Sequence, residues 1–267
     1  MKKMMKIGIM QGRFTNKGGF FPQSFPWVNW QKEFEIGEEN QIDCIEWMFN
    51  YERYENNPLF TKDGTDEISN VITQTGVMVP SVCANYYMEK ALCKDNELVV
   101  LETICRGMRR IGAKMLVVPL FGDNNPKNRN ERTLLVYALK ESERVCTKYG
   151  INLCIEADWK LKEIYDLLAE VEKLGICYDI GNSAGIGKET VKEVEALREK
   201  VVDVHVKDKS YKGASVMLGK GCADIKNTIR VLNDIGYAGN IILESYFDQD
   251  AICDTVTNLT YVRRCLG

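Results

Sequence analysis

Four short apolar segments in the second half of the chain each end in a side chain that can bind a metal ion. The segments read Cys154-Ile155-Glu156, Cys177-Tyr178-Asp179, Asp203-Val204-His205 and Ile242-Leu243-Glu244. His205 is the only histidine in 267 residues. Three carboxylates and one imidazole favour a borderline-to-hard cation such as Mn²⁺, Mg²⁺, Co²⁺ or Fe²⁺ over a thiolate-rich zinc site. The segments predict a site for one divalent ion, provided that their ends meet.

Each of these residues also has a structural explanation. A histidine in an apolar strand is often a hydrogen-bonded core residue. An acid after a strand often caps the next helix, and Asp158 is placed to do so. The combination favours a metal, because burying three carboxylates together without a cation costs several kcal/mol in desolvation and repulsion.

The segments belong to a repeating unit in which an amphipathic helix is followed by a glycine and a short apolar strand. A glycine just past a helix end adopts the left-handed conformation without steric cost. The glycines of the repeat are Gly76, Gly112, Gly150, Gly175 and Gly236. With three further apolar runs, the pattern predicts eight strands, at 6–10, 43–48, 77–83, 114–120, 151–157, 176–180, 201–206 and 240–245.

The segments between these strands have helical periodicity. In residues 95–111, where Asp95 is the expected N-cap, apolar residues recur at three- and four-residue steps and define one helix face. They are Leu98, Leu101, Ile104, Cys105, Met108 and Ile111. Similar patterns predict helices at 131–149, 160–174, 188–200, 224–235 and 250–264.

Eight strands alternating with about eight helices predict a (β/α)₈ TIM barrel that forms a single domain over residues 1–267. The strands are almost continuously apolar, as expected where helices cover the sheet. An open doubly wound sheet is the main alternative, but no G-x-G-x-x-G motif follows the first strand. In a barrel the four strand ends converge on one face. The irregular segment 14–28 is expected there, as a lid or as an aromatic cluster on the barrel rim.

Composition restricts the partners and the compartment. The net charge of −3 gives no general attraction for nucleic acid. The ten cysteines form no C-x-x-C pair, and we interpret them as reduced thiols of a cytoplasmic protein. The apolar run after the basic N-terminus is too short for an export signal. No segment approaches the roughly 20 apolar residues that span a bilayer.

The strand-end motifs resemble those of the xylose isomerase-like barrel superfamily, and within it the sugar and sugar-phosphate isomerases and 3-epimerases. The motifs are Ile155-Glu156-Ala157-Asp158, Tyr178-Asp179-Ile180-Gly181-Asn182, Val204-His205-Val206-Lys207-Asp208 and Ile242-Leu243-Glu244-Ser245. The run 218–224 with 235–240 also resembles that group, and 7–13 resembles the first strand of its sugar-phosphate branch. The resemblance covers nearly the whole chain, and the order and spacing of the motifs are more specific than any one of them.

The resemblance implies that Glu156, Asp179, His205 and Glu244 bind one metal ion, with Mn²⁺ expected and Mg²⁺, Co²⁺, Fe²⁺ or Zn²⁺ as alternatives. It also implies that Glu156 and Glu244 are the acid/base pair. A metal that chelates a ketose can stabilise an enediolate. One glutamate then removes the proton beside the carbonyl and the other returns a proton from the opposite face. Return to the same carbon epimerises the sugar, and return to the neighbouring carbon isomerises it.

Two positions depart from the free-ketose epimerases. Three residues after the strand-six aspartate they often have a histidine, and here the residue is Asn182. An asparagine can bind a hydroxyl but cannot transfer a proton at neutral pH. Two residues after the first glutamate they often have another glutamate, and here it is Asp158.

Basic residues after the seventh strand suggest a phosphorylated substrate. Lys207, Lys209, Lys212 and Lys220 lie where barrels often bind phosphate, and the amides of Gly219 and Gly221 could assist. A solvated lysine loop is the alternative. Arg13 is a second candidate for a phosphate or hydroxyl contact. Glu46 is expected to contact substrate or support a ligand, unless it is only an acid of the barrel rim.

Three other functions remain open. Abasic-site endonucleases of the same superfamily need three zinc ions and several histidines, which one histidine cannot supply. A dehydratase or lyase acting on a cyclitol or hydroxy acid would use the same metal. A non-catalytic sugar-binding barrel would not need paired glutamates. The expected partner is a small sugar or sugar phosphate rather than nucleic acid or a membrane, and a homo-oligomer is possible.

Overall fold

A computed structural model describes residues 5–16, 24–94, 96–248 and 250–267. Ten strands occur in this part of the chain: β1 Lys6–Met10, β2 Cys44–Met48, β3 Ser81–Cys83, β4 Met115–Pro119, β5 Asn152–Glu156, β6 Gly175–Asp179, β7 Val201–Val206, β8 Asp208–Lys209, β9 Ser215–Val216 and β10 Asn240–Leu243. The α-helices are α1 Trp30–Glu39, α2 Lys62–Thr75, α3 Glu97–Ile111, α4 Arg129–Tyr149, α5 Leu161–Glu170, α6 Ile180–Gly185, α7 Thr190–Leu197, α8 Ile225–Asp234 and α9 Ala251–Leu266.

Eight of these strands form a closed parallel barrel in the order β1-β10-β7-β6-β5-β4-β3-β2, which confirms the predicted TIM-barrel fold. Strands β8 and β9 form a separate antiparallel pair that the sequence patterns did not predict. The chain divides into two compact units, Met1–Glu46 with Ile176–Gly267, and Trp47–Gly175. We call them the first and second units. The single-domain expectation for residues 1–267 stays a prediction.

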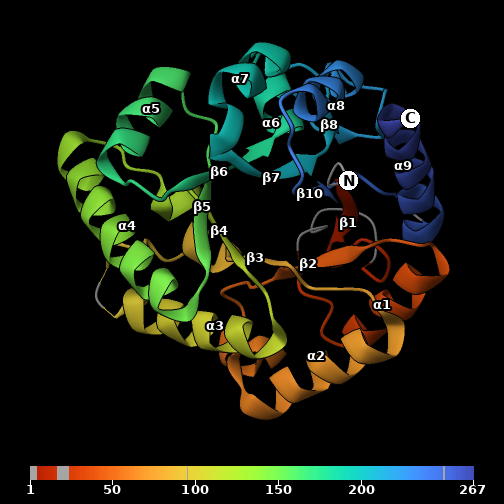
Figure 1. Cartoon of the computed structure of the whole chain (residues 1–267), viewed down its shortest axis with the longest axis horizontal. Coiled ribbons are helices and arrows are strands. Elements are labelled where there is room, and N and C mark those ends of the chain that lie inside the picture. Colours follow the sequence, from red (N-terminus) through yellow and green to blue (C-terminus); the bar gives the residue numbers. More distant parts are fainter. Residues whose placement is uncertain (1–4, 17–23, 95, 249) are drawn as a thin grey trace. The chain divides into compact units, whose positions relative to one another are not determined.

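In the first unit, three strands carry candidate metal ligands at or near their carboxyl ends. Strand β1 pairs with β10 and with β2, and Met10 lies beside Glu46 in the register. Strand β7 pairs with β6 and β10, so that His205 has Asp179 on one side and Ile242 on the other. Helices α1, α8 and α9 lie outside these strands (Figure 1). The register therefore brings the ends of β6, β7 and β10 to one level.

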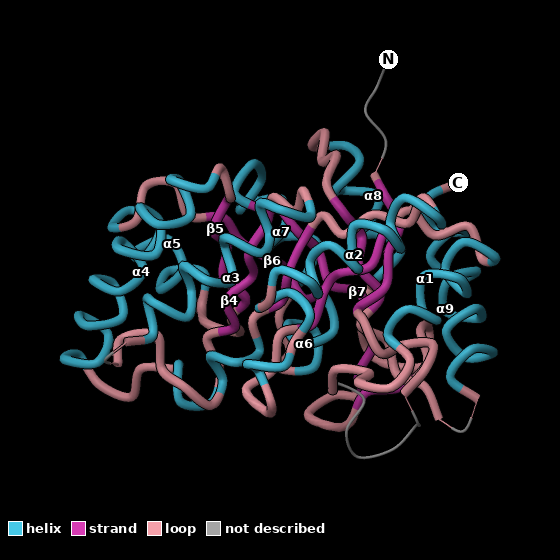
Figure 2. The backbone as a smooth tube through the Cα atoms, turned by 90° about the horizontal axis from the view of Figure 1, so that it is seen from below, coloured by secondary structure: helices cyan, strands magenta, loops and turns pink. Residues whose placement is uncertain are grey.

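In the second unit, β3, β4 and β5 run parallel, with Pro119 beside Glu156 in the register. Helices α2, α3 and α4 lie outside them, and the tube view shows the same order of strands within and helices outside in each unit (Figures 1 and 2). The strands contribute fully buried apolar side chains to the core, among them Val82, Leu116, Val117 and Ile155.

Most predicted boundaries agree with the structure to within one or two residues. Strand β3 is shorter than the predicted run 77–83, because Pro80 has no N–H to donate to a ladder. Helix α5 ends at Glu170 rather than at residue 174, since Val171 is already extended (φ −124°). Gly175 belongs to β6 and is not a left-handed helix cap, so that expectation was wrong, whereas Gly76 and Gly112 have φ of 73° and 82° as predicted.

Two predicted features lie wholly or partly outside the described residues. The N-cap expected at residue 95 lies outside them, and the residue before α3 is Asn96. Of the predicted lid, residues 17–23 also lie outside. Within its described part, Phe25 is buried and its ring contacts that of Trp27 with centroids 4.8 Å apart. These contacts suit the aromatic cluster, and closure of a lid stays a prediction.

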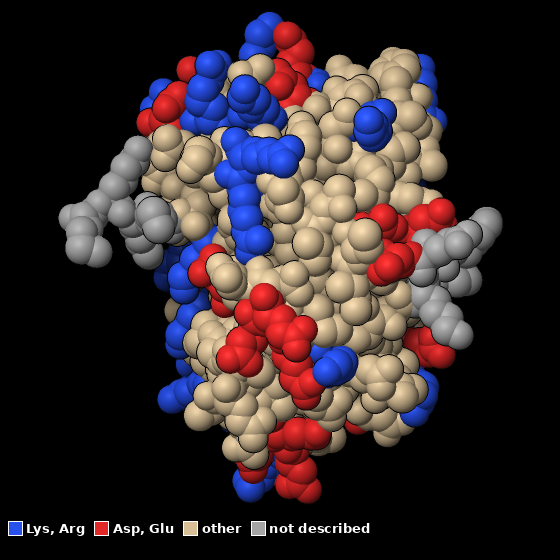
Figure 3. Space-filling model, turned by 90° about the vertical axis from the view of Figure 1, so that its right-hand side faces the viewer, with Lys and Arg blue, Asp and Glu red and all other residues tan. Residues whose placement is uncertain are grey.

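Other expectations concern the surface and the thiols. All ten cysteines lie in the described residues, and none of them forms a disulfide there. Within the described residues, none of the helices combines the length and the apolar character that crossing a bilayer requires. Acidic and basic side chains both gather on the face drawn in Figure 3, in agreement with a net charge near neutrality.

Candidate active site

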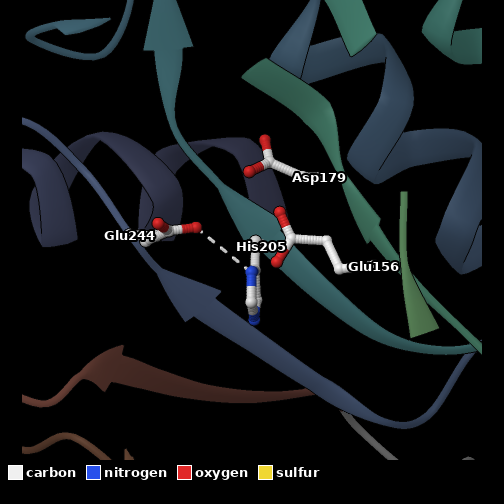
Figure 4. Close-up of side chains that lie close together, drawn as sticks. All are labelled: Glu156, Asp179, His205 and Glu244. Atoms are coloured by element: carbon white, nitrogen blue, oxygen red, sulfur yellow. Dashed lines mark ion pairs between the residues drawn. The ribbon is translucent and has the colours of Figure 1, made fainter. Parts of the chain in front are cut away.

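Three candidate ligands lie together at the strand ends of the first unit. Asp179 is the last residue of β6, His205 is the fifth residue of β7, and Glu244 directly follows β10. Their exposed fractions are 5%, 0% and 5%. Figure 4 shows the side chains and marks the ion pair between His205 and Glu244, in which Nδ1 lies 3.1 Å from Oε2.

The other ring nitrogen of His205 contacts a second carboxylate. Nε2 lies 2.7 Å from Oε1 of Glu46, and both side chains are fully buried. Glu46 therefore contacts the imidazole rather than solvent. Of the two roles expected for this residue, the position suits support of a ligand better than a direct contact with substrate.

Lys207 provides a buried positive charge next to the same carboxylates. Its Nζ lies 3.0 Å from Oδ2 of Asp179 and 2.8 Å from Oε1 of Glu244. The lysine stem passes Gly181, where an added Cβ would lie 2.3 Å from Cγ of Lys207. Only glycine leaves room for this side chain, which explains the glycine two residues after Asp179.

The charges around Glu244 favour its ionised form. Burial alone would raise the pKa of this carboxyl, but Lys207, His205 and Arg13 together hold it well below its usual range. Burial likewise opposes the charged form of His205, but Cys177, Glu46 and Glu244 raise its pKa well above the ordinary value. The site therefore holds an ionised glutamate beside an imidazole that binds a proton strongly.

A further buried carboxyl lies on the same strand as His205. Asp203 is fully buried, and its pKa is raised well above the ordinary value by burial and by the neighbouring Glu46. Sequence analysis missed this residue. Its position two residues before His205 was the available signal, because alternate residues of a strand point to the same side.

Arg13 is buried at the end of β1, and its guanidinium lies 5.9 Å from the centre of the Phe247 ring. Two contacts hold its loop in place. The Thr255 hydroxyl donates to the carbonyl oxygen of Arg13 at 2.7 Å, and the buried carboxylate of Glu33 accepts the amides of Gly12, Phe14 and Thr15. The arginine is thus fixed at the same end of the unit as Glu244, whose pKa it helps to lower.

The remaining predicted substrate contacts of this unit differ in exposure. The backbone N–H of Asn182 donates to Oδ1 of Asp179 at 2.8 Å. The side-chain oxygen of Asn182 lies 3.5 Å from Nζ of Lys209. Lys220 is exposed. The expected phosphate-binding role of the Gly219 and Gly221 amides was wrong, because both donate to Oδ2 of Asp208, at 2.9 and 2.8 Å.

In the second unit, Glu156 ends β5 and is 6% exposed. Its carbonyl oxygen accepts the amide of Leu120 at 2.8 Å, which fixes the backbone there. Asp158 is half-buried and does not cap the next helix, because α5 begins after Lys160, whose amide donates to Glu163. Glu156, Asp179, His205 and Glu244 are all buried, and each offers one atom of a kind that binds metal.

Sequence analysis also missed an aromatic cluster in the second unit, at the ends of β2 and β3. Tyr54 and Tyr86 are at its centre, with ring centroids 5.1 Å apart, and Nζ of Lys90 lies 4.6 Å from the Tyr51 ring. The signal was the density of aromatic residues in the segments 47–54 and 85–87. Such rings could pack against the apolar face of a sugar.

Comparisons with known proteins agree with this architecture. The chain is 25% identical over 197 residues to L-ribulose-5-phosphate 3-epimerase UlaE of Escherichia coli, covering 66% of this chain and 68% of that protein. The structure of 3-keto-D-glucoside 4-epimerase YcjR from E. coli matches with a TM-score of 0.76 at 18% identity, over 98% of this chain and 100% of the other.

A D-psicose 3-epimerase from Clostridium cellulolyticum matches with the same TM-score at 13% identity, over 98% of this chain and 99% of the other. These structural similarities concern the fold. The family model described as "Xylose isomerase-like TIM barrel" matches residues 34–265, most of the chain. The chain therefore belongs to the xylose isomerase-like TIM barrel family.

Proposed function

We propose that this protein is a metal-dependent isomerase that epimerises a ketose or ketose phosphate at C3. The observation that carries the proposal is the environment of Glu244. Its Oε1 is held by Lys207, while its Oε2 is buried and lies 3.1 Å from Nδ1 of His205. An ionised oxygen left in this state is a suitable ligand for a cation.

The proposed metal ligands are Glu156, Asp179, His205 and Glu244. One imidazole and three carboxylates suit Mn²⁺ best among the common ions, with Mg²⁺, Co²⁺, Fe²⁺ or Zn²⁺ as alternatives. When bound, the metal would polarise the ketose carbonyl and so acidify the neighbouring C–H bond. The fit rests on the donor set and on the Glu244 oxygen described above.

Glu156 and Glu244 are the proposed acid/base pair. One carboxylate takes the proton from C3 as the C3–H bond breaks, and the bond electrons pass into the carbonyl to give an enediolate. The other glutamate delivers a proton to C3 from the opposite face, and the carbonyl re-forms with C3 inverted. Removal of a proton from C1 instead, with delivery of a proton to C2, would give an aldose, so the same pair also permits isomerisation.

The proposed substrate contacts are Arg13, Asp158, Asn182 and Lys220. Glu46 and Lys207, which we also expected to contact substrate, are buried in ion pairs with His205 and Glu244. We propose that they act through these two residues. Arg13 provides a buried guanidinium at the strand ends, and such a group binds phosphate or a hydroxyl well. UlaE is named for a phosphorylated pentulose, which favours a ketose phosphate. We also propose a cytoplasmic location, where such substrates occur with reduced thiols.

The proposal is tested with metal-stripped protein and a panel of ketoses and ketose phosphates. Mn²⁺ should restore formation of the 3-epimer, measured by chromatography of the products. Glu244→Gln should keep the fold, because the barrel core does not depend on it, while turnover falls about 10²- to 10⁴-fold. Near-normal turnover in Glu244→Gln would eliminate the acid/base assignment.

A further inference from the structure

We propose that Glu46 is a positioning residue, which holds a proton on Nε2 of His205 so that Nδ1 is the nitrogen that binds the metal. The inference rests on the proposed metal-dependent function and deepens it. It concerns the contact between Glu46 and His205, both of which belong to the first unit.

The two sides of the imidazole ring differ in distance. On the Nε2 side, the nitrogen lies 2.7 Å from Oε1 of Glu46, which is the length of a direct, charge-assisted hydrogen bond. Two ligands about 2.1 Å from one metal at right angles are about 3 Å apart. On the Nδ1 side, the distance of 3.1 Å between Nδ1 and Oε2 of Glu244 matches the separation of two ligands of one metal. The distances assign the proton to Nε2 and the metal to Nδ1.

The neighbouring charges agree with this assignment. A carboxylate oxygen accepts hydrogen bonds, so a proton on Nε2 accounts for its 2.7 Å contact with Oε1 of Glu46. Asp179 lies beside His205 in the strand register, and Lys207 links it to Glu244. In Figure 4 one ring nitrogen of His205 is directed to Glu244, and the other points away from both Glu244 and Asp179. Glu46 is thus on the opposite side of the ring from Glu244 and Asp179.

Position in the fold explains how Glu46 reaches the ring. It is the third residue of β2 and pairs with Met10 of β1, and its side chain is fully buried. His205 is held in turn by the registers of β6 and β10. Ring and carboxylate therefore project from strands that the barrel core fixes. Partners of this kind set the tautomer and orientation of a ligating histidine and raise its basicity.

The test uses the single histidine of the chain. Protein labelled with ¹⁵N in the imidazole gives one ring spin system, which reports both nitrogens by NMR. In metal-free protein we expect a slowly exchanging, low-field proton on Nε2. With Zn²⁺ as a diamagnetic probe, Nδ1 should shift as the metal-bound nitrogen while Nε2 keeps its proton.

Glu46→Gln keeps the size of the side chain and removes its charge. In this variant we expect the Nε2 proton of His205 to resonate further upfield and to exchange faster. We expect the affinity of the protein for Zn²⁺ to fall about 10- to 100-fold. The matched control is Glu193→Gln, which removes another buried carboxylate of the same unit. The Glu193 carboxylate accepts a hydrogen bond from the Tyr178 hydroxyl rather than contacting His205. This control should keep both the Nε2 signal and the Zn²⁺ affinity of the wild type.

Two results would overturn the inference: Zn²⁺ bound at Nε2 with the proton on Nδ1, or an Nε2 proton and a Zn²⁺ affinity that do not respond to Glu46→Gln. Failure of the proposed function looks different. In that case Zn²⁺ shifts neither nitrogen, while the Nε2 proton of the metal-free protein still depends on Glu46.

Discussion

The ammonium of Lys207 lies 2.8 Å from one carboxylate oxygen of Glu244, while the other oxygen of Glu244 lies 3.1 Å from the imidazole of His205. Lys207 also reaches Asp179 at 3.0 Å. One buried lysine therefore neutralises carboxylates at the ends of two strands and orients the oxygens that we propose as metal ligands. This arrangement gives the site an internal cation even without metal.

Replacing Lys207 with methionine should destabilise the metal-free protein more than the metal-loaded protein. Without the ammonium, the buried carboxyl groups of Asp179 and Glu244 lose the cation that both of them contact, and breaking such a pair costs about 3–5 kcal/mol. A bound divalent ion would offset part of that loss. Urea denaturation in EDTA and in Mn²⁺ measures both free energies of unfolding.

The control for this experiment is Lys188→Met. Lys188 also pairs with a carboxylate in the first unit, at 3.6 Å from Glu193, where no metal is proposed. Its loss of stability should be the same with and without Mn²⁺. An equal loss in both conditions for Lys207→Met would contradict the compensating role of Lys207.

Metal affinity should rise with pH over the range in which His205 loses its proton. The pKa of His205 is raised above its ordinary value because Cys177, Glu46 and Glu244 outweigh the effect of burial. A metal needs the lone pair of Nδ1, so protons compete with it below that pKa, by up to about tenfold per pH unit. The competition extends above pH 6.5, the ordinary pKa of histidine. Calorimetry in buffers of different ionisation enthalpy measures the protons released.

The same shift predicts how pH affects the stability of the metal-free protein. Because the folded-state pKa of His205 is raised, its contribution to stability is fully present below the unfolded-state pKa. It is lost as pH rises through the folded-state value. Stabilisation by metal should therefore grow with pH across that range. A metal-induced rise in Tm that is the same at pH 6 and at the alkaline end of the range would contradict this account.

Asp208→Ala should loosen the loop between β9 and α8. The Asp208 carboxylate accepts the amides of Gly219, Gly221 and Ala223 at 2.8–3.1 Å. The cost per amide should lie below the roughly 1–3 kcal/mol of a buried unpaired donor, because Gly219 and Gly221 are exposed and water can replace the acceptor. Hydrogen exchange at these three amides should become faster in the variant.

Asp224→Ala is the comparison for this variant. Asp224 caps α8 by accepting the amide of Asn227, so its loss should cost about 1 kcal/mol. It should leave exchange at Gly219 and Gly221 unchanged. If those amides exchange at the wild-type rate in Asp208→Ala, Asp208 does not hold the loop.

The fold could be predicted from sequence because its signals are local. Apolar runs, helical periodicity and glycine at helix ends depend on near neighbours in the chain, and Gly76, Gly112 and Gly150 have the predicted left-handed conformation. The errors arose where another local effect dominated, as at Pro80, which shortens β3. The β8–β9 pair has two residues in each strand, too few for a periodic pattern.

The site could be predicted only in part, because ion pairs join residues far apart in sequence. Strand-end position was enough to predict that Asp179, His205 and Glu244 lie close together. It could not show that Lys207 turns back onto Asp179 and Glu244, or that Glu46 reaches His205, 159 residues away. These contacts depend on strand register and side-chain direction, which sequence patterns do not specify.

The most direct test of the proposed function is proton exchange at carbon. Mn²⁺-loaded protein would be incubated in D₂O with the best ketose or ketose phosphate of the panel, and deuterium located by NMR. The account predicts metal-dependent deuterium at C3, lost in Glu156→Gln and Glu244→Gln while both variants keep the wild-type circular dichroism spectrum. Deuterium at C1 alone would indicate an aldose–ketose isomerase. No exchange into any sugar, by protein that still binds Mn²⁺, would contradict the proposed enediolate chemistry.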